Sequence, residues 1–429
     1  MPRPAHLLIA CAVALLGLGV VMVQSAGMDV THGPGLDVDA ADPTAWGLLG
    51  QFVNKNLVCA VLAVAAMLTG SRVDLMGIFR SRSWISPVWV AMVLALVLCG
   101  LTLVPGMGRS ANGASRWLTL GPPGVGVSFQ PSELMKWTLV IALAWYCTRR
   151  RGVMGRFWWG LVPGLVLTAV ASGIVVIEDL GTGSLIAAGA VVVLVAGGAK
   201  VWHLALMLPP ALGGLAFAIY QEPYRIRRLT AFMDPWADAQ GTGYHPIQSM
   251  LAFAQGGLGG SGLGGSVQKY YIPEDTTDFL FPILCEELGF GGAALVVGLF
   301  IAMLWIGLGI CRDTEDMFGR LVGVGVLFTV GLQAVINIAV VTVVVPTKGI
   351  ALPFVSMGGT GWVFTGFALG LVASLDNANV LRAEQAEKTN GQAVAGPPAV
   401  RLAREQVQES DDVEQSEGAV LPQPVPQAA

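Results

Sequence analysis

Charge is the first thing that this sequence lacks. Only 12% of its 429 residues are Asp, Glu, Lys or Arg, whereas soluble domains carry about 25%. Hydrophobic residues make up 54% of the chain, so the composition indicates a protein that folds in lipid. The net charge of −4 adds little, because much of the acidity follows Gln385.

Paired cysteines and clustered histidines are also missing. The six cysteines lie mostly in apolar runs without paired spacing, which is typical of small buried residues and argues against a disulfide framework or a cysteine metal site. The four histidines are scattered, so there is no zinc motif. A glycine-rich run at Gly256–Ser266 lacks a following GKS or GKT and a preceding Rossmann strand, so it does not indicate a nucleotide site.

What the sequence does contain is a series of apolar runs, many near the length of about 20 residues that spans a bilayer as a helix. A chain this apolar crosses a membrane only as helices or as a closed barrel, and these runs are too long and unbroken for barrel strands. The prediction is an all-α, polytopic membrane protein of about ten transmembrane helices with a large extracytoplasmic loop. The expected spans are Leu7–Val23, Val53–Leu68, Trp84–Val104, Ser132–Cys147, Phe157–Ile177, Ser184–Gly198, Val201–Tyr220, Phe281–Cys311, Phe318–Val345 and Phe354–Leu375.

Positive charges fall in alternate short loops between these runs, and the intervening segments hold aspartates and glutamates. By the positive-inside rule, both termini are expected to face the cytoplasm. The large loop, at about 221–281, is expected to face the outside. The expected organisation is a transmembrane domain over residues 1–382 and a disordered cytoplasmic tail over residues 383–429. The tail is expected to be disordered because it has few aromatic residues and many Gln, Glu, Pro and Ala residues.

The stretch Tyr224–Gly289 is longer and more polar than a connector needs to be. A loop beyond about 15 residues is usually functional or disordered, and the aromatic residues in this one argue against disorder. We expect the helices to hold this segment over the outer membrane surface. Its glycine-rich run, Gly256–Ser266, is interpreted as a flexible or closely approaching turn.

Asp278, in the run EDTTDFLF just before an apolar helix, is the candidate catalytic residue. Carboxylates at or inside a membrane helix are costly and indicate function. The alternative is an ordinary helix start, in which Thr276 or Thr277 caps the helix and Asp278 lies at the positive end of the helix dipole. The sequence leaves both open. On a helix that already begins at Asp278, Glu286 would lie roughly 80° away around the axis.

Several cations lie on the expected outer side, against the positive-inside rule, and an anionic ligand there would account for them. Lysine and arginine bind phosphate as a point charge and as a planar fork, respectively. The alternative is that these side chains snorkel to the interface. This is weakest for Lys348, because the glycines of its loop let a backbone approach a ligand, although they also let helices pack closely. The candidate ligand-binding residues are Arg109, Arg116, Lys136, Lys269, Lys348, Glu286 and Ser356.

Four motifs follow one another along the chain: NGASRWLTLG with QPSELMK, EDLGTG, the run from RLTAFMDPW to CEELG, and PTKGIALPFVSMGGTG. Together they resemble the landmarks of the SEDS family (shape, elongation, division and sporulation), the FtsW, RodA and SpoVE proteins. The resemblance covers about residues 5–380. The PTKG form resembles the division branch of the family, FtsW, more than the elongation branch.

The resemblance implies a ten-helix peptidoglycan glycosyltransferase of the bacterial cytoplasmic membrane, which polymerises lipid II into glycan strands on the outer side during septal wall synthesis. The implied partners are lipid II, a class B penicillin-binding protein (a transpeptidase), other division proteins and membrane lipid, with no nucleic acid. The family's catalytic aspartate, in its HTDF motif, matches Asp278 in TTDF. The family's histidine is Thr276 here, its GYQ is GYH with His245, and its SYGGSS is SMGGTG, with Met357 and Gly361.

One carboxylate can suffice for that reaction, because a diphosphate leaves an anomeric carbon without help from an acid, unlike the leaving groups of glycoside hydrolysis. Asp278 would deprotonate the attacking hydroxyl. A divalent cation, Mg²⁺ or Mn²⁺, would offset the charge of the leaving group, although no ligand set for it is evident. Two alternatives remain open: a flippase or transporter of lipid-linked precursors, with charges near the membrane midplane, and a non-catalytic division scaffold, in which Asp278 would be replaceable.

Overall fold

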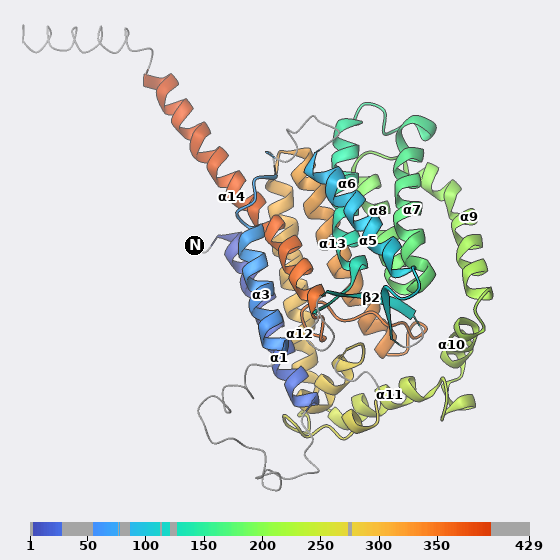
Figure 1. Cartoon of the computed structure of the whole chain (residues 1–429). Helices are drawn as coiled ribbons and strands as arrows, with labels where there is room; N and C mark the ends of the chain where they lie inside the picture. Colours follow the sequence, from blue (N-terminus) through green and yellow to red (C-terminus); the bar gives the residue numbers. More distant parts are fainter. Residues whose placement is uncertain are drawn as a thin grey trace, which may run out of the picture. The chain divides into compact units, whose positions relative to one another are not determined.

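The apolar runs of the sequence form α-helices in the computed structural model of the chain (Figure 1). The structure describes residues 3–27, 55–75, 77, 86–111, 114–120, 127–272 and 277–395. The chain divides into two units, residues 1–377 and residues 378–429. The elements are α1 (Pro4–Ala26), α3 (Lys55–Gly70), α5 (Pro87–Thr102), β1 (Gly108–Ala111), β2 (Ala114–Leu120), β3 (Val127–Phe129), α6 (Pro131–Arg149), the π-helical turn η1 (Phe157–Leu161), α7 (Val162–Glu178), α8 (Leu180–Ala196), α9 (Val201–Tyr220), α10 (Pro223–Met233), η2 (Pro235–Asp238), α11 (Tyr244–Gly256), η3 (Gln268–Tyr270), α12 (Leu280–Asp313), α13 (Met317–Val341) and α14 (Thr360–Ala395).

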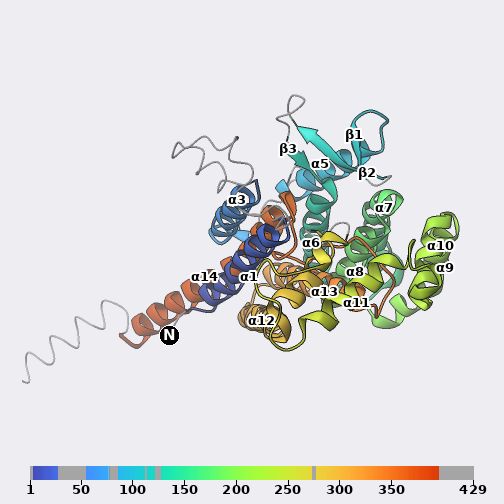
Figure 2. The same cartoon turned by 90° about the horizontal axis from the view of Figure 1, so that it is seen from below.

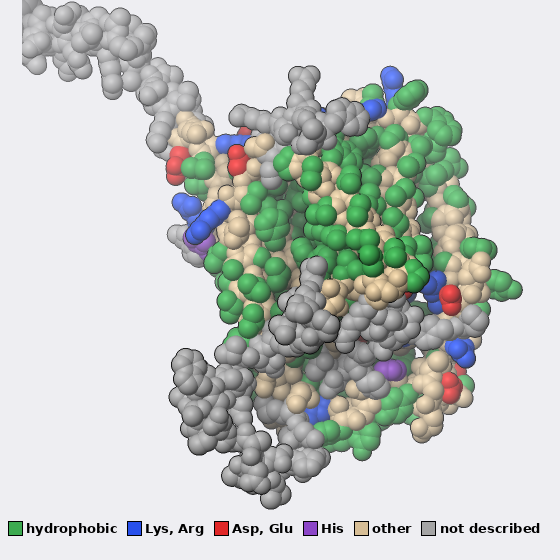
Figure 3. Space-filling model, viewed as in Figure 1, with side chains coloured by type: hydrophobic (Ala, Val, Ile, Leu, Met, Phe, Trp, Pro, Cys, Tyr) green, Lys and Arg blue, Asp and Glu red, His purple; other side chains and the backbone are tan. Residues whose placement is uncertain are grey.

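Six helical segments in the described part of the chain are long and apolar enough to cross a membrane: α1, η1 with α7, α9, α12, α13 and α14. Three shorter apolar helices accompany them, in α3, α5 and α8. Hydrophobic side chains form a broad belt across the molecule (Figure 3). The prediction of an all-α, polytopic membrane protein is confirmed. Each predicted run contains a helix, but length and hydropathy do not confirm a count of ten spans.

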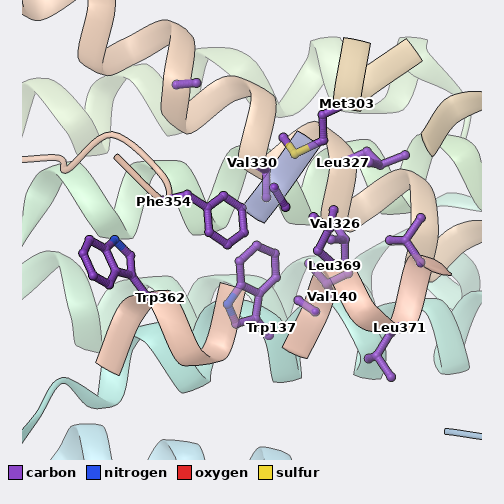
Figure 4. Packing of buried hydrophobic residues seen from close by; sticks show 14 of the residues in the cluster. Trp137, Val140, Met303, Val326, Leu327, Val330, Phe354, Trp362, Leu369 and Leu371 are labelled. Atoms are coloured by element: carbon purple, nitrogen blue, oxygen red, sulfur yellow. The ribbon is translucent and has the colours of Figure 1, made fainter. Parts of the chain in front are cut away.

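The interior is built around α13, which packs against α6, α8 and α12. Small residues on α13 allow this close approach, since a Cβ at Gly325 would lie 2.6 Å from Val193 of α8 and 2.7 Å from Val140 of α6. Figure 4 shows the aromatic rings of Trp137, Phe354 and Trp362 among the packed aliphatic side chains.

Helix α9 contrasts with α13, because α9 contains no buried residue. It packs chiefly against α10. Seen from below, these two helices lie at one edge, away from α12 and α13 (Figure 2).

Residues 108–129 contain a small antiparallel sheet in the order β1-β2-β3, which the prediction of an all-α protein did not include. In its central strand, Leu118 pairs with Gly108 on one side and with Phe129 on the other. Hydropathy summed over the length of a span does not detect strands of three to seven residues. The sheet matters here because β2 carries Arg116.

The large loop is folded rather than irregular, with α10, η2, α11 and η3 in succession. Ser249 Oγ, on α11, donates to the Val341 carbonyl at the end of α13 at 2.6 Å. In the glycine-rich run, Gly260 has a φ of +72° and lies against the Glu287 carbonyl, where a Cβ would not fit. The predicted close approach of this run is confirmed.

Helix α12 begins at Leu280, one residue from the predicted Phe281, so the prediction that Asp278 lies just before the helix is confirmed. The angle of roughly 80° between Asp278 and Glu286 applied only to a helix that already begins at Asp278, and it does not hold here. One predicted boundary is wrong. Helix α14 begins at Thr360 rather than at Phe354, because residues 354–359 belong to the loop before it, in which residues 354–356 are buried and Phe354 has a φ of +64°. The domain boundary at residue 382 stays a prediction, and residues 396–429 of the predicted tail lie outside the described residues.

Candidate active site

Asp278 lies in the turn that leads into α12 and is half-buried. Its backbone carbonyl accepts a hydrogen bond from Nδ2 of Asn337 at 2.9 Å. Phe279, at the start of the helix, makes no side-chain capping bond, and Thr277 does not stand at the cap position. The capping interpretation is therefore wrong for Thr277, and Thr276 lies outside the described residues.

The loop between α13 and α14 passes directly beside the Asp278 carboxylate. A Cβ added to Gly349 would lie 2.8 Å from Oδ2 of Asp278, so the backbone at this position is in close approach to the carboxylate. Lys348 precedes Gly349 and is half-buried. Burial lowers the pKa of Lys348 below its ordinary value, and the charge of Asp179 acts in the opposite direction.

Two amides on α13 hold this loop in place. Nδ2 of Asn337 also donates to the Ile350 carbonyl at 2.8 Å, so one side chain joins the Asp278 turn to the loop. One helical turn earlier, Nε2 of Gln333 donates to the Ala351 carbonyl at 2.9 Å. Neither residue is among those that the sequence predicts for the site. The available signal was two amides spaced four residues apart in an apolar run, which places them on one helix face.

Arg116 reaches the same region from β2. Its Nη1 lies 3.3 Å from Oδ2 of Asp179, and its Nε donates to the Glu178 carbonyl at 3.0 Å. Asp179 caps α8 by accepting from the backbone N–H of Thr182 at 2.9 Å. Arg116, Asp179 and Ser132 line a cavity of about 20 Å³, which has room for one water.

The EDLGTG segment at the start of α8 also contacts the Lys348 loop, since a Cβ at Gly181 would lie 3.2 Å from Cγ1 of Ile350. Arg228, on α10, donates through Nη1 to the Thr347 carbonyl at 3.4 Å. The structure thus brings Asp278, Lys348 and Arg116 to one end of the first unit, around the loop that follows α13.

Lys136 lies inside the helical bundle and is 1% exposed. Its Nζ is 2.8 Å from Oε2 of Glu133 and donates to Oε1 of Gln333 at 3.0 Å. Because Gln333 also holds the Ala351 carbonyl, Lys136 supports the loop beside Asp278 through one intervening side chain.

Glu286 is buried and engaged by the glycine-rich segment. Its carboxylate accepts hydrogen bonds from Oγ of Ser266 at 2.5 Å and from the backbone N–H of Val267 at 2.8 Å. Its backbone carbonyl accepts from the N–H of Ser261 at 2.9 Å. Glu286 therefore fastens the glycine-rich segment to α12. Its position in the sequence did not indicate this role.

Lys269 and Ser356 are likewise buried and bonded to the protein. Nζ of Lys269 donates to the carbonyls of Ser25 at 3.3 Å and Gly264 at 3.2 Å. Oγ of Ser356 accepts from the N–H of Leu352 at 3.0 Å within its own loop. The side chain of Arg109 lies outside the described residues. Ligand binding by Lys136, Lys269, Glu286 and Ser356 stays a prediction.

His245 lies beside the catalytic candidate. Its ring stacks on Phe279 with centroids 5.2 Å apart and an interplanar angle of 27°. The imidazole, where the family motif has Gln, therefore packs one residue from Asp278 in this chain. Two other residues depart from the family motifs. Met357 is 41% exposed, and a Cβ added at Gly361 would lie 3.5 Å from Glu133.

Nothing in the described ranges gathers three or more His, Cys, Asp or Glu side chains into a metal-binding group. The described residues around Asp278 therefore do not form a ligand set for the divalent cation that the reaction could use.

Comparisons with known proteins agree with the motifs. The family of cell cycle proteins comprising FtsW, RodA and SpoVE matches residues 5–380. Stage V sporulation protein E of Bacillus subtilis is 35% identical over 374 residues, which cover 87% of this chain and 96% of that protein. The probable peptidoglycan glycosyltransferase FtsW of Nitrosococcus halophilus is 38% identical over 386 residues, which cover 87% of this chain and 92% of that protein.

Two solved structures have the same fold. One is a chain of a peptidoglycan synthase complex that coordinates polymerization and crosslinking; it is 26% identical, has a TM-score of 0.64, and matches over 87% of this chain and 97% of that chain. The other is the rod shape determining protein RodA of Thermus thermophilus, which is 24% identical with a TM-score of 0.58 over 87% of this chain and 96% of that chain. At this identity the second likeness shows the fold alone.

Proposed function

Because the chain belongs to the FtsW, RodA and SpoVE family of cell cycle proteins, we infer that it is a membrane-embedded peptidoglycan glycosyltransferase. The substrate proposed is lipid II, a disaccharide-peptide on a polyprenyl diphosphate. The observation that carries the mechanism is the close approach of the Asp278 carboxylate to the backbone of Gly349, beside Lys348.

In the proposed reaction, the Asp278 carboxylate removes the proton from the acceptor sugar hydroxyl, which contributes a factor of about 10² to 10⁴ to the rate. A bond forms between the hydroxyl oxygen and the anomeric carbon of the donor, and the bond from that carbon to the diphosphate oxygen breaks. The polyprenyl diphosphate leaves as an anion, and Asp278 passes its proton to solvent.

Lys348 and Arg116 are proposed to hold the diphosphate. Lys348 offers a point charge on a half-buried loop. Arg116 uses its Nε and Nη1 for Glu178 and Asp179, and a guanidinium has five N–H donors, so the rest of the fork is available to phosphate oxygens. Arg109 remains a proposed third cation.

We also propose the finer features of the assembly. The partner is a class B penicillin-binding protein, in line with the polymerization and crosslinking of the complex that shares the fold. The work takes place at the division septum, with other division proteins. Both termini face the cytoplasm, and the transmembrane domain ends near residue 382 ahead of a disordered tail.

The deciding experiment incubates the purified protein with lipid II in detergent, alone and with its transpeptidase partner. Glycan polymer is expected in at least one of the two reactions. A flippase would give no polymer in either reaction, because detergent removes the two compartments that transport requires. A scaffold would give none because it forms no glycosidic bond. The ion pair between the half-buried Glu133 and the buried Lys136 is the charged pair inside the bundle that fits the transporter alternative. Polymer formed in detergent would exclude a protein that only transports.

Lys348→Ala is expected to raise the KM for lipid II about tenfold to hundredfold, the loss associated with one hydrogen bond to a charged group. Since burial lowers the pKa of Lys348, its ammonium loses its proton at a lower pH than an exposed lysine does. The KM of the wild-type protein should therefore rise early on the alkaline side, and Lys348→Arg should remove that rise. An unchanged KM and pH profile in Lys348→Ala would exclude the proposed role.

A further inference from the structure

The end of the bundle opposite Asp278 carries a basic and aromatic surface that the glycosyl transfer does not use. It is formed by the end of α6, the turn after it, η1 and the start of α9. Three tryptophans stand out from it, with exposures of 72% for Trp158, 70% for Trp159 and 82% for Trp202. We call this surface the basic–aromatic rim; its cations, all exposed, are Arg149, Arg150, Arg151, Arg156 and Lys200.

The backbone that carries the rim is closely packed. Met154, in the middle of the turn, is 1% exposed. Gly160 of η1 lies against the Val153 carbonyl and the backbone of Met154, where no Cβ would fit. Oη of Tyr146 donates to the Gly160 carbonyl at 2.7 Å. The cations therefore project from a fixed turn and not from a loose loop.

Several contacts bring the charges together from both sides of the turn. Nη1 of Arg150 donates to the Trp159 carbonyl at 3.4 Å. A Cβ at Gly155 would lie 3.7 Å from Cε of Lys200, so the lysine stem crosses the turn. The start of α9 is tied to η1 by an edge-to-face contact between Phe157 and His203, with centroids 5.4 Å apart.

The rim has little internal charge compensation. The sequence contains no Asp or Glu in residues 149–177 or 180–221. Arg151, Arg156 and Lys200 take no part in the ion pairs Arg116–Asp179 and Lys136–Glu133. Lys and Arg side chains also appear above the hydrophobic belt at this end of α6 and α7 (Figure 3). A positive surface of this kind suits an anionic ligand from outside the chain.

The tryptophans indicate where that ligand lies. Exposed tryptophans at the ends of membrane helices sit at the level of the lipid headgroups, and η1 with α7 and α9 are both candidate spans. We propose that the basic–aromatic rim binds the headgroup phosphate of an anionic phospholipid in the leaflet on this side. Trp158 and Trp202 flank the headgroup, and Arg151, Arg156 and Lys200 contact its phosphate. The inference is independent of the glycosyltransferase activity.

The test compares lipid retention by the purified full-length protein in mixed micelles, read out by native mass spectrometry. The wild-type protein is expected to retain phosphatidylglycerol over phosphatidylcholine. The triple variant Arg151→Gln, Arg156→Gln, Lys200→Gln should lose at least tenfold of that preference, and Lys200→Gln alone on the order of fivefold. Because these side chains are exposed, the variants are expected to keep the wild-type melting temperature.

The matched control removes three exposed cations from the same end, with Arg72→Gln, Arg312→Gln and Arg320→Gln. These follow α3 or lie beside Asp313 and Asp316 at the α12–α13 turn, on elements that do not form the rim. Retention of phosphatidylglycerol should be close to wild type. Equal loss in both triple variants would mean a general charge effect and would overturn the proposal. So would displacement of the lipid by inorganic phosphate at the same concentration, which would indicate a site for a free anion.

Discussion

Asp278→Asn is expected to lower the rate of glycan polymerisation by a factor of about 10² to 10⁴, the contribution of a general base. Asparagine keeps the shape of the side chain but cannot accept the proton of the sugar hydroxyl. The Asp278 contact with Asn337 uses the backbone carbonyl, so the substitution leaves it in place. The measurement is polymer formed from lipid II by the purified variant, with insertion and folding checked by its melting temperature.

Glu222→Gln is the matched control, because it removes one carboxylate from an exposed position at the start of α10 on the same side of the protein. It should polymerise at the wild-type rate. Gly349→Ala gives a second approach, since its Cβ would lie 2.8 Å from Oδ2 of Asp278 and must displace the carboxylate. Turnover should fall with a folded protein. Full glycan synthesis by Asp278→Asn would remove this residue from the mechanism.

Lys136→Met is expected to destabilise the protein by about 3–5 kcal/mol, the loss seen when one partner of a buried ion pair is removed. The Lys136 side chain is 1% exposed and that of Glu133 14%, so the carboxylate left behind is only slightly hydrated. Oε1 of Gln333 loses its donor as well. The measurement is the midpoint of thermal unfolding in detergent.

The double variant Glu133→Gln, Lys136→Met separates charge from packing. Without the unpaired carboxylate, much of the loss should be recovered, although the loop contact of Gln333 would still lack its lysine partner. Arg320→Gln removes an exposed cation at the start of α13 and should leave the midpoint unchanged. A single Lys136→Met variant as stable as the wild type would show that the pair contributes nothing to the fold.

Helix positions could be predicted from the sequence because a span must be long and apolar wherever it lies in the bundle. The runs predicted at Leu7–Val23 and Val201–Tyr220 correspond to α1 and α9 within a few residues. Hydropathy wrongly placed Phe354 and Val355 in a membrane-spanning helix, because these two residues are apolar without being helical. These residues belong to a loop that lies inside the bundle, and their carbonyls pack against Gly19 of α1. Irregular backbone at such a place is stable when protein surrounds it.

The site could be predicted only in part. Asp278 was identified because a carboxylate at the mouth of an apolar helix is costly. Lys348 and Arg116 were identified as cations on the wrong side for topology. The sequence could not show that Gly349 approaches the carboxylate or that Asn337 bridges the two segments, because both depend on how α13 packs against loops far away in the chain.

The two amides on α13 reduce the number of ways in which the site can move. Asn337 is bonded to the turn that carries Asp278 and to the Lys348 loop, and Gln333 is bonded to the same loop one turn away. A shift of α13 along its axis displaces base and loop together and preserves their spacing. A rotation of α13 about its axis swings both amides off their carbonyls at once. The spacing between Asp278 and the Lys348 loop is therefore insensitive to sliding of α13 along its axis but sensitive to rotation of α13 about its axis.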